Sequence, residues 1–303
     1  MKSFSGVPRR DLSIAAVSAA SLELSGKRIA VVGGTGGLGR ALARLLAARG
    51  AAVTVVGQTF RDEGTEGLSF LKADLNLMSE ARRVARALPA ETLDAVLLTT
   101  GIFAAPEREV TAEGLERDLA VSYLSRLVIL RELAPRLGKG RPAGAPRPRV
   151  FVMGFPGTNQ KGDPTDLNAE RAYAAMETHM NTVAGNEALV LDAVRRYPDV
   201  DFFGLNPGLI KTNIRSNVLG GEGSIRQRLV EGVIGLLMIS ADTYAARIAP
   251  LLVAPALERQ SGAMFNQKAV PIHASPVMTE AHVAALISAS EALLPREATR
   301  AVS

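Results

Sequence analysis

Short apolar runs alternate along this chain with longer segments whose apolar residues recur at helical spacing. In residues 38–48, positions 38, 41, 42, 45 and 46 are apolar and form one stripe of an α-helix, which Gly50 ends. Seven short apolar runs are predicted to be strands: 28–32, 53–56, 68–73, 93–99, 150–153, 202–205 and 263–266. The predicted helices are 38–48, 79–88 with Ser79 as N-cap, 170–196, 241–252 and 279–293, with others between 111 and 137 and near 224–239. Whether Gly185 interrupts the helix over 170–196 stays open.

This alternation of strands and helices predicts the fold class. Parallel strands need crossover connections, so a repeated strand–helix order is typical of an α/β protein. We expect a single doubly wound domain over residues 26–303, with a mostly parallel seven-stranded sheet and helices on both faces. Residues 1–25 show no clear period and are predicted to be an N-terminal arm.

Composition excludes several kinds of site. The chain has no Cys, and its three His residues are scattered, so we expect neither a disulfide nor a metal site. No apolar run is long enough to span a bilayer. The segment that begins with Arg9-Arg10 is interpreted as part of the arm, because its apolar run is too short for an export signal. These patterns favour a cytoplasmic protein that does not bind a membrane.

The charge balance favours an anionic ligand. The formal net charge is +5, which makes an anion easy to accept. The densest basic stretch, residues 139–149, is rich in Pro and Gly and has no interleaved aromatic residue. It is predicted to be a solvated loop and not a nucleic-acid-binding arm. We therefore expect a small-molecule ligand and no nucleic acid.

A glycine-rich turn, Gly33-Gly34-Thr35-Gly36-Gly37-Leu38-Gly39, joins the first predicted strand to the first predicted helix. Its spacing fits both G-x-x-x-G-x-G and G-x-G-x-x-G. Glycines in such a turn permit a positive φ and let backbone N–H groups approach a pyrophosphate. The helix N-terminus adds the positive end of its dipole. We predict a Rossmann dinucleotide site made by Gly33, Thr35, Gly36, Gly37, Leu38 and Gly39.

The end of the second predicted strand indicates which dinucleotide binds. An acidic residue there would bind the adenosine ribose hydroxyls, whereas a basic residue accommodates a 2′-phosphate. The strand ends without an acid, and Gln58, Thr59 and Arg61 are candidates to hold a phosphate. This favours NADP, but Asp62 and Glu63 lie close by and leave NAD as the alternative.

Further landmarks resemble the short-chain dehydrogenase/reductase family over about residues 27–270. Asp74 and Leu75 look like the family's adenine-contacting segment, and Thr100-Gly101 occupies the place of its N-N-A-G segment. Pro207-Gly208 followed by Thr212 looks like the motif that contacts the nicotinamide carboxamide. The resemblance implies that all of these residues bind the cofactor, and that residues 212–240 form a loop over the substrate.

The family's catalytic residues do not follow. The family carries a Tyr and, four residues later, a Lys that lowers the pKa of the Tyr. When Asn186 and Leu189 are aligned with the family's A-N-x-x-L stretch, the Tyr position falls on His179 and the Lys position on Val183. The family's Ser falls on Gly154 or Phe155, and its helix Asn falls on Ser122.

A second register would place Tyr173 at the position of the catalytic Tyr. The residue four positions later is Glu177, an anion that would raise the pKa of the Tyr and not lower it. The candidate catalytic residues are therefore His179 and Ser122, with Tyr173 as the alternative.

Three functions compete at this point. The first is a NAD(P)(H)-dependent oxidoreductase that acts on the carbonyl or alcohol of a hydrophobic organic substrate, with His179 as acid and base. The others are a non-redox cyclase or isomerase on the same scaffold and a non-catalytic NAD(P)-binding protein. Phe103, Phe155, Met180 and Asn181 are predicted to neighbour the site. The resemblance also implies a homodimer or homotetramer paired through the helices over 122–137 and 170–196.

Overall fold

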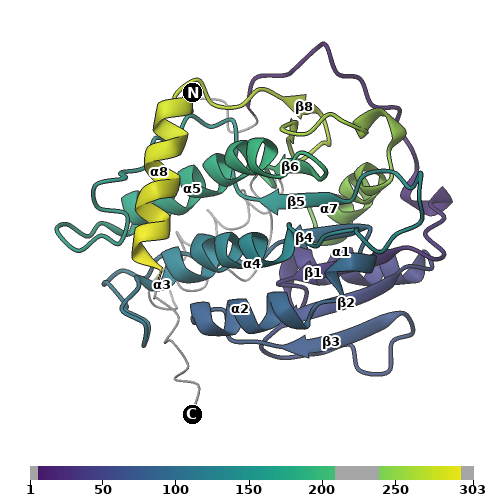
Figure 1. Ribbon diagram of the computed structural model, residues 1–303, viewed down its shortest axis with the longest axis horizontal. Helices are drawn as coiled ribbons and strands as arrows, with labels where there is room; N and C mark the ends of the chain where they lie inside the picture. The colour runs from purple at the N-terminus through teal and green to yellow at the C-terminus, as the bar shows by residue number, and fades with distance from the viewer. Residues whose placement is uncertain (1–5, 209–238, 295–303) are drawn as a thin grey trace, which may run out of the picture.

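The computed structural model describes residues 6–208 and 239–294 as a parallel sheet covered by helices on both faces (Figure 1). The sheet order is β3-β2-β1-β4-β5-β6-β7-β8. The strands are β1 Arg28–Val32, β2 Ala52–Gly57, β3 Leu68–Lys72, β4 Ala95–Leu98, β5 Arg149–Met153, β6 Asp201–Leu205, β7 Met264–Phe265 and β8 Pro271–Ile272. All pairings are parallel except β7 with β8. The α/β prediction is confirmed, with eight strands in place of seven; β8 was missed because two residues beginning with Pro show no period.

The strand order reverses between β1 and β4. The chain first moves outward from β1 through β2 to β3, and then crosses to β4 on the other side of β1. At such a switch point the loops that follow the two strands diverge, which opens a crevice at the carboxyl edge of the sheet. The glycine-rich turn follows β1, and Thr100-Gly101 follows β4. Both therefore border this crevice.

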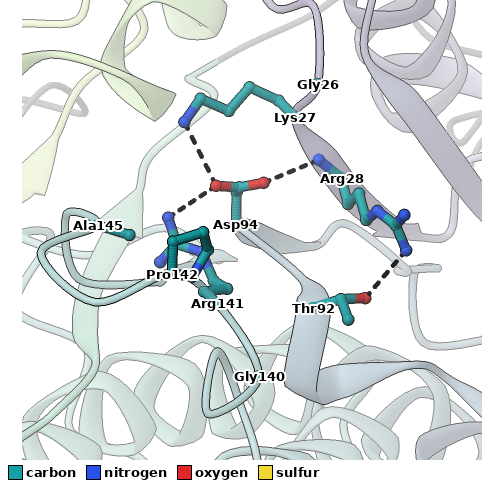
Figure 2. Close-up of a pocket in the computed structure, with 9 residues that line it drawn as sticks. All are labelled: Gly26, Lys27, Arg28, Thr92, Asp94, Gly140, Arg141, Pro142 and Ala145. Atoms are coloured by element: carbon teal, nitrogen blue, oxygen red, sulfur yellow. Dashed lines mark hydrogen bonds and ion pairs between the residues drawn. The ribbon is translucent and has the colours of Figure 1, made fainter.

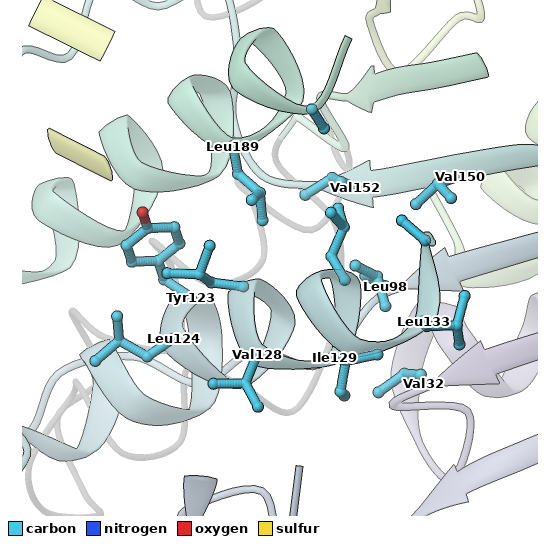
Figure 3. Packing of buried hydrophobic residues seen from close by; sticks show 14 of the residues in the cluster. Val32, Leu98, Tyr123, Leu124, Val128, Ile129, Leu133, Val150, Val152 and Leu189 are labelled. Atoms are coloured by element: carbon cyan, nitrogen blue, oxygen red, sulfur yellow. The ribbon is translucent and has the colours of Figure 1, made fainter. Parts of the chain in front are cut away.

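Two helical layers cover the sheet. On one face lie α1 (Gly37–Ala48) and α7 (Ala241–Ile248), and on the other lie α2 (Met78–Ala87), α4 (Ser125–Leu133) and α5 (Ala175–Arg196). Figure 3 shows Ile129 of α4 beside Val32 of β1, and Val128 and Leu133 belong to the same buried cluster. In Figure 1, α8 (Glu280–Leu293) lies across α5 on the outside. Four short 3-10 helices complete the described elements: Ala19–Ser21, Ala90–Thr92, Ala249–Leu252 and Pro255–Leu257.

Several predicted helix ends are wrong. Helix α2 begins at Met78, and its first N–H groups are bound by the Glu113 carboxylate, so Ser79 is not its N-cap. Residues 111–116 form a loop before α3 (Arg117–Leu119), a π-helical segment (Ala120–Leu124) and α4. Helix α5 begins at Ala175, five residues later than predicted, and continues through Gly185. The helix predicted near 224–239 lies outside the described residues, apart from Ile239.

The segment before β1 packs along the domain. Pro8 forms an antiparallel bridge with Ile272 of β8, and Leu22 and Leu24 are buried in the same core layer as α1 and α7. This segment therefore protects the end of the sheet, where a free edge would otherwise offer unpaired backbone groups. No helix within the described residues is long and apolar enough to cross a membrane.

Candidate active site

The glycine-rich turn passes between β1 and the end of β4 with almost no free space. Gly33 has φ of +89°, and a Cβ there would lie 2.5 Å from the backbone nitrogen of Thr100. A Cβ on Gly39 would lie 2.4 Å from the carbonyl oxygen of Gly33 and 2.4 Å from the Thr99 hydroxyl. These two positions therefore require glycine, because any side chain would push α1 away from the sheet.

The start of α1 fits the pyrophosphate of a dinucleotide. Gly36 is the N-cap in an extended conformation, and no side chain caps the helix. A Cβ on Gly36 would meet only the Arg61 guanidinium, 3.6 Å away. The Thr100 hydroxyl beside the turn is buried and has no hydrogen-bond partner among the described residues. Uncapped helical N–H groups and an orphaned hydroxyl are what a phosphate-bearing ligand would satisfy.

The acidic residue after β2 is already occupied. The Asp62 carboxylate is buried and accepts two hydrogen bonds from Arg40, at 2.8 and 2.7 Å. These bonds hold the pKa of Asp62 below its ordinary value. Arg61 is exposed, and its guanidinium donates to the carbonyl oxygen of Thr35 in the glycine-rich turn. Arg61 therefore approaches the glycine-rich turn, whereas the Asp62 carboxylate is bound to Arg40.

The remaining predicted residues around the adenosine end form a second contact. Gln58 donates to Asp74 at 2.8 Å, so its amide is bound to the end of β3. Burial alone would raise the pKa of Asp74, but hydrogen bonds from Asn76 and Gln58 bring it below its ordinary value. Thr59 is exposed and Leu75 is buried. The structure thus brings the ends of β2 and β3 together beside the turn.

A polar chain runs from α5 to the loop after β4. His179 Nδ1 lies 2.7 Å from Asp118 Oδ2, and the Ser122 hydroxyl donates to Asp118 Oδ1 at 2.5 Å. Ser122 in turn accepts from the backbone N–H of Ile102 at 2.9 Å. Asp118 is fully buried, whereas the His179 side chain is 16% exposed. The site therefore contains an Asp–His pair, with Ser122 fixing the carboxylate.

The free edge of His179 faces an apolar neighbour. Its ring lies against Phe103, with ring centroids 4.4 Å apart. Within the described residues its hydrogen bonds involve only Nδ1, which leaves Nε2 available. A hollow of about 310 Å³, of which His179 is not a lining residue, lies along the start of α5 and is lined by Gln160, Lys161, Gly162, Asp163, Met176, Glu177, Met180 and Asn181. Two of the predicted neighbours of the site, Met180 and Asn181, thus border this hollow, and Phe103 contacts the imidazole directly.

Tyr173 lies just before α5 and not on it. Its hydroxyl donates to the carbonyl oxygen of Ala105 at 2.5 Å. Burial raises the pKa of Tyr173, and the carboxylates of Glu116 and Asp118 raise it further. Because a raised pKa disfavours the phenolate, Tyr173 lacks the tuning that a catalytic Tyr needs.

Two residues of this site were missed by sequence reasoning. Asp118 precedes Ser122 by four residues, which is the helical spacing that places two side chains on one face. Arg126 follows Ser122 by the same spacing, and its buried guanidinium donates to Asn186 at 2.9 Å. The signal in the sequence is therefore the i, i+4 series 118, 122 and 126, which becomes visible only once that helix is placed.

Other positions that the family resemblance singled out lie around the ends of β5 and β6 and on α5. Val183 is buried on α5 one turn after His179. Gly154 follows β5, where a Cβ would lie 3.0 Å from the Cβ of Asn186. Asn206 holds the backbone of Gly208 by accepting its N–H at 2.9 Å. Thr212 and almost all of the predicted loop over 212–240 lie outside the described residues.

A second hollow, of about 380 Å³, lies at the opposite, amino edge of the sheet. Figure 2 shows Asp94 at its centre, bound to Lys27, to Arg141 and to the backbone N–H of Arg28. Its lining charges are thus engaged with one another. This arrangement stabilises the loop before β5 and offers no chemistry comparable to the Asp–His pair.

Comparisons with known proteins show which proteins this chain is similar to. No family model matches the chain. It is 50% identical over 279 residues to an uncharacterized oxidoreductase of Saccharomyces cerevisiae, with 91% of this chain and 90% of the relative covered. It is 26% identical to the bovine dehydrogenase/reductase SDR family member 12, with 83% and 80% covered. A short chain dehydrogenase structure from Salmonella enterica has a TM-score of 0.59 at 17% identity, with 81% of this chain and 97% of that chain covered.

Proposed function

The chain belongs to the short-chain dehydrogenase/reductase family, and we propose that it is a NADP(H)-dependent oxidoreductase that interconverts the carbonyl and alcohol of a hydrophobic organic substrate. Its similarity to these relatives indicates an oxidoreductase that uses a nicotinamide cofactor. The further proposal is that His179 acts in place of the family's Tyr. The observation that carries it is the 2.7 Å contact between His179 Nδ1 and the buried Asp118.

Asp118 prepares His179 for proton transfer. A buried carboxylate that accepts from Nδ1–H fixes the ring orientation and leaves Nε2 as the atom that exchanges a proton. The same carboxylate stabilises the imidazolium by its charge.

Proton transfer from His179 to the substrate oxygen would accompany hydride transfer to the carbonyl carbon. A nicotinamide cofactor held at the glycine-rich turn would supply hydride-transfer chemistry at the carbonyl carbon, in either direction. As the carbonyl π bond breaks, His179 Nε2 donates its proton to the oxygen and the alcohol O–H forms. The imidazole is then neutral, and its Nδ1–H still donates a hydrogen bond to Asp118. Because the side chain is 16% exposed, it can recover its proton from solvent.

The preference for NADP is supported by the two charged residues that follow β2. Asp62 is bound to Arg40 and Arg44, so it does not offer a free carboxylate to the ribose hydroxyls. Arg61 is exposed beside the turn and can pair with a 2′-phosphate. NAD lacks that phosphate and would gain nothing from Arg61.

A hydrophobic substrate is supported by the surroundings of the imidazole. The Phe103 ring lies against the His179 ring at a tilt of 40°, and Met180 follows His179 in the chain. An aromatic face beside one polar group is suited to a ligand that presents a single carbonyl or hydroxyl. We therefore expect aromatic or long-chain aldehydes, ketones or alcohols as substrates.

The test is a screen of such aldehydes and ketones with NADPH, comparing the wild type with His179→Ala. The variant should lose at least about 100-fold in turnover, as expected for a lost general acid, while its affinity for NADPH measured by calorimetry stays nearly the same. His282→Ala is the matched control, because His282 binds the carbonyl oxygen of Lys161 and should leave turnover unchanged. Full turnover in His179→Ala would exclude the role assigned to it.

A further inference from the structure

Arg126 is a buried cation directly beneath the carboxyl edge of the sheet. It is 3% exposed, and its guanidinium donates to the carbonyl oxygens of Thr100 and Met153, at the ends of β4 and β5. It also donates to Asn186 on α5 at 2.9 Å. One side chain from α4 thus joins two strand ends and a helix at the place where the crevice lies.

This guanidinium is not fully satisfied by those contacts. Its Nε is buried and has no hydrogen-bond partner among the described residues. Burial lowers the pKa of Arg126 to about 9, and the charge of Asp118 opposes that shift. The side chain is therefore charged at neutral pH, and it is coupled to the same carboxylate that holds His179. A buried cation without a hydrogen-bonded carboxylate is costly, which argues for a role beyond packing.

We infer that Arg126 and Asp118 balance each other's charge, so that the site strongly favours neither redox form of the nicotinamide cofactor. This inference rests on the proposed function. Arg126 then supplies the buried positive charge that the family takes from its Lys, a residue replaced here by Val183. Arg126 is a positioning residue. It contributes its charge and holds the ends of β4 and β5, but it does not exchange a proton with the substrate.

The expected effect is electrostatic. The oxidised nicotinamide ring carries a positive charge, whereas the reduced ring is neutral. Arg126 and Asp118 together are neutral, so neither redox form is strongly favoured by a net charge. If Arg126 is lost, the carboxylate is left alone and attracts the cationic ring. If the charge of Asp118 is lost, the guanidinium is left alone and repels it. Such forces are strong in a buried site.

The experiment measures the dissociation constants of NADP⁺ and NADPH separately, without substrate. In Arg126→Met the ratio of Kd for NADP⁺ to Kd for NADPH should fall about tenfold, a change of roughly 1.4 kcal/mol. In Asp118→Asn the ratio should rise by a similar factor. Arg126→Lys keeps the charge and should keep the ratio within about twofold of the wild type. These opposite signs are not expected from a structural defect, which weakens both forms alike.

Arg149→Met is the matched control. Arg149 is equally buried and donates to the carbonyl oxygens of Leu251 and Ala254, but it begins β5 at the opposite edge of the sheet. Its loss should lower stability and leave the ratio unchanged. If Arg126→Met binds NADP⁺ and NADPH more weakly by the same factor, the inference is overturned. If Arg126→Met does not fold, an unchanged ratio of the two dissociation constants in Asp118→Asn overturns it. A wild type that binds neither form would overturn the proposed function as well.

Discussion

Asp62 lies in the stretch after β2 where an acidic side chain would bind the adenosine ribose. Its carboxylate is instead bound to Arg40 through two hydrogen bonds and has a further ion pair with Arg44 at 3.9 Å. From sequence alone, Asp62 left the choice between NAD and NADP open, because its side-chain direction was unknown. The ion pair removes that objection to NADP.

The same ion pair predicts a pH-dependent stability. Arg40 lowers the pKa of Asp62 in the folded protein, so the ionised carboxylate stabilises the fold above the unfolded pKa of about 3.9. That contribution is lost as the pH falls through the lowered folded pKa. Asp62→Asn should therefore cost about 1 kcal/mol at pH 7, since Arg40 is partly exposed and screened. Urea unfolding at several pH values measures it, and a deficit that persists undiminished in acid would contradict the assignment.

The candidate catalytic residues illustrate how far single positions could be predicted. The family resemblance placed His179 and Ser122 in one site, and in the structure both are hydrogen-bonded to the Asp118 carboxylate. Asp118 itself was missed because the pattern over 111–137 gave no helix register. A contact between residues 61 positions apart depends on how two helices pack, and no local pattern encodes it.

At the scale of elements, the π-helical segment Ala120–Leu124 places Ser122 between Asp118 and Ile102. A π-helical turn inserts a residue into the helix and is often found at functional sites. Such a turn has no signature in the hydrophobic pattern. Helix ends were missed for a related reason: Glu113 caps α2 from a distant loop, which intrinsic capping preferences do not predict.

The contact between the π-helical segment and α5 gives a second prediction. A Cβ on Gly185 would lie 2.6 Å from the ring of Tyr123, which is fully buried. Gly185→Ala should therefore destabilise the protein by about 1–3 kcal/mol, although Ala favours helix more than Gly does. Thermal unfolding measures the loss. A variant with raised stability would mean that helix propensity outweighs the close packing of these two helices.

At the scale of the whole molecule, α8 bears on the predicted assembly. It packs on α5 (Figure 1). Its Glu291 accepts a hydrogen bond from Arg131 of α4, and its Ser290 is hydrogen-bonded to Tyr123 of the π-helical segment. The homodimer or homotetramer stays a prediction. Pairing through α4 and α5 would have to accommodate α8, which the sequence analysis placed correctly without indicating which surface it covers.

The amino edge of the sheet supplies a third prediction, because it can be weakened without touching the crevice. Asp94 joins Lys27 before β1 to Arg141 in the loop before β5 (Figure 2). Asp94→Asn keeps an acceptor for the backbone N–H of Arg28 but loses both ion pairs. It should cost about 1–2 kcal/mol in stability and leave the affinity for NADPH unchanged. A large loss of affinity would show that the two edges are coupled.

His179 Nε2 is proposed to exchange the proton with the substrate. The most direct test is whether free imidazole restores the activity of His179→Ala. With a carbonyl substrate from the screen, NADPH consumption by His179→Ala is followed as imidazole is added. We expect imidazole to restore a substantial part of the lost rate in His179→Ala and to add nothing to the wild-type rate. A variant that turns over at the wild-type rate without imidazole would contradict it.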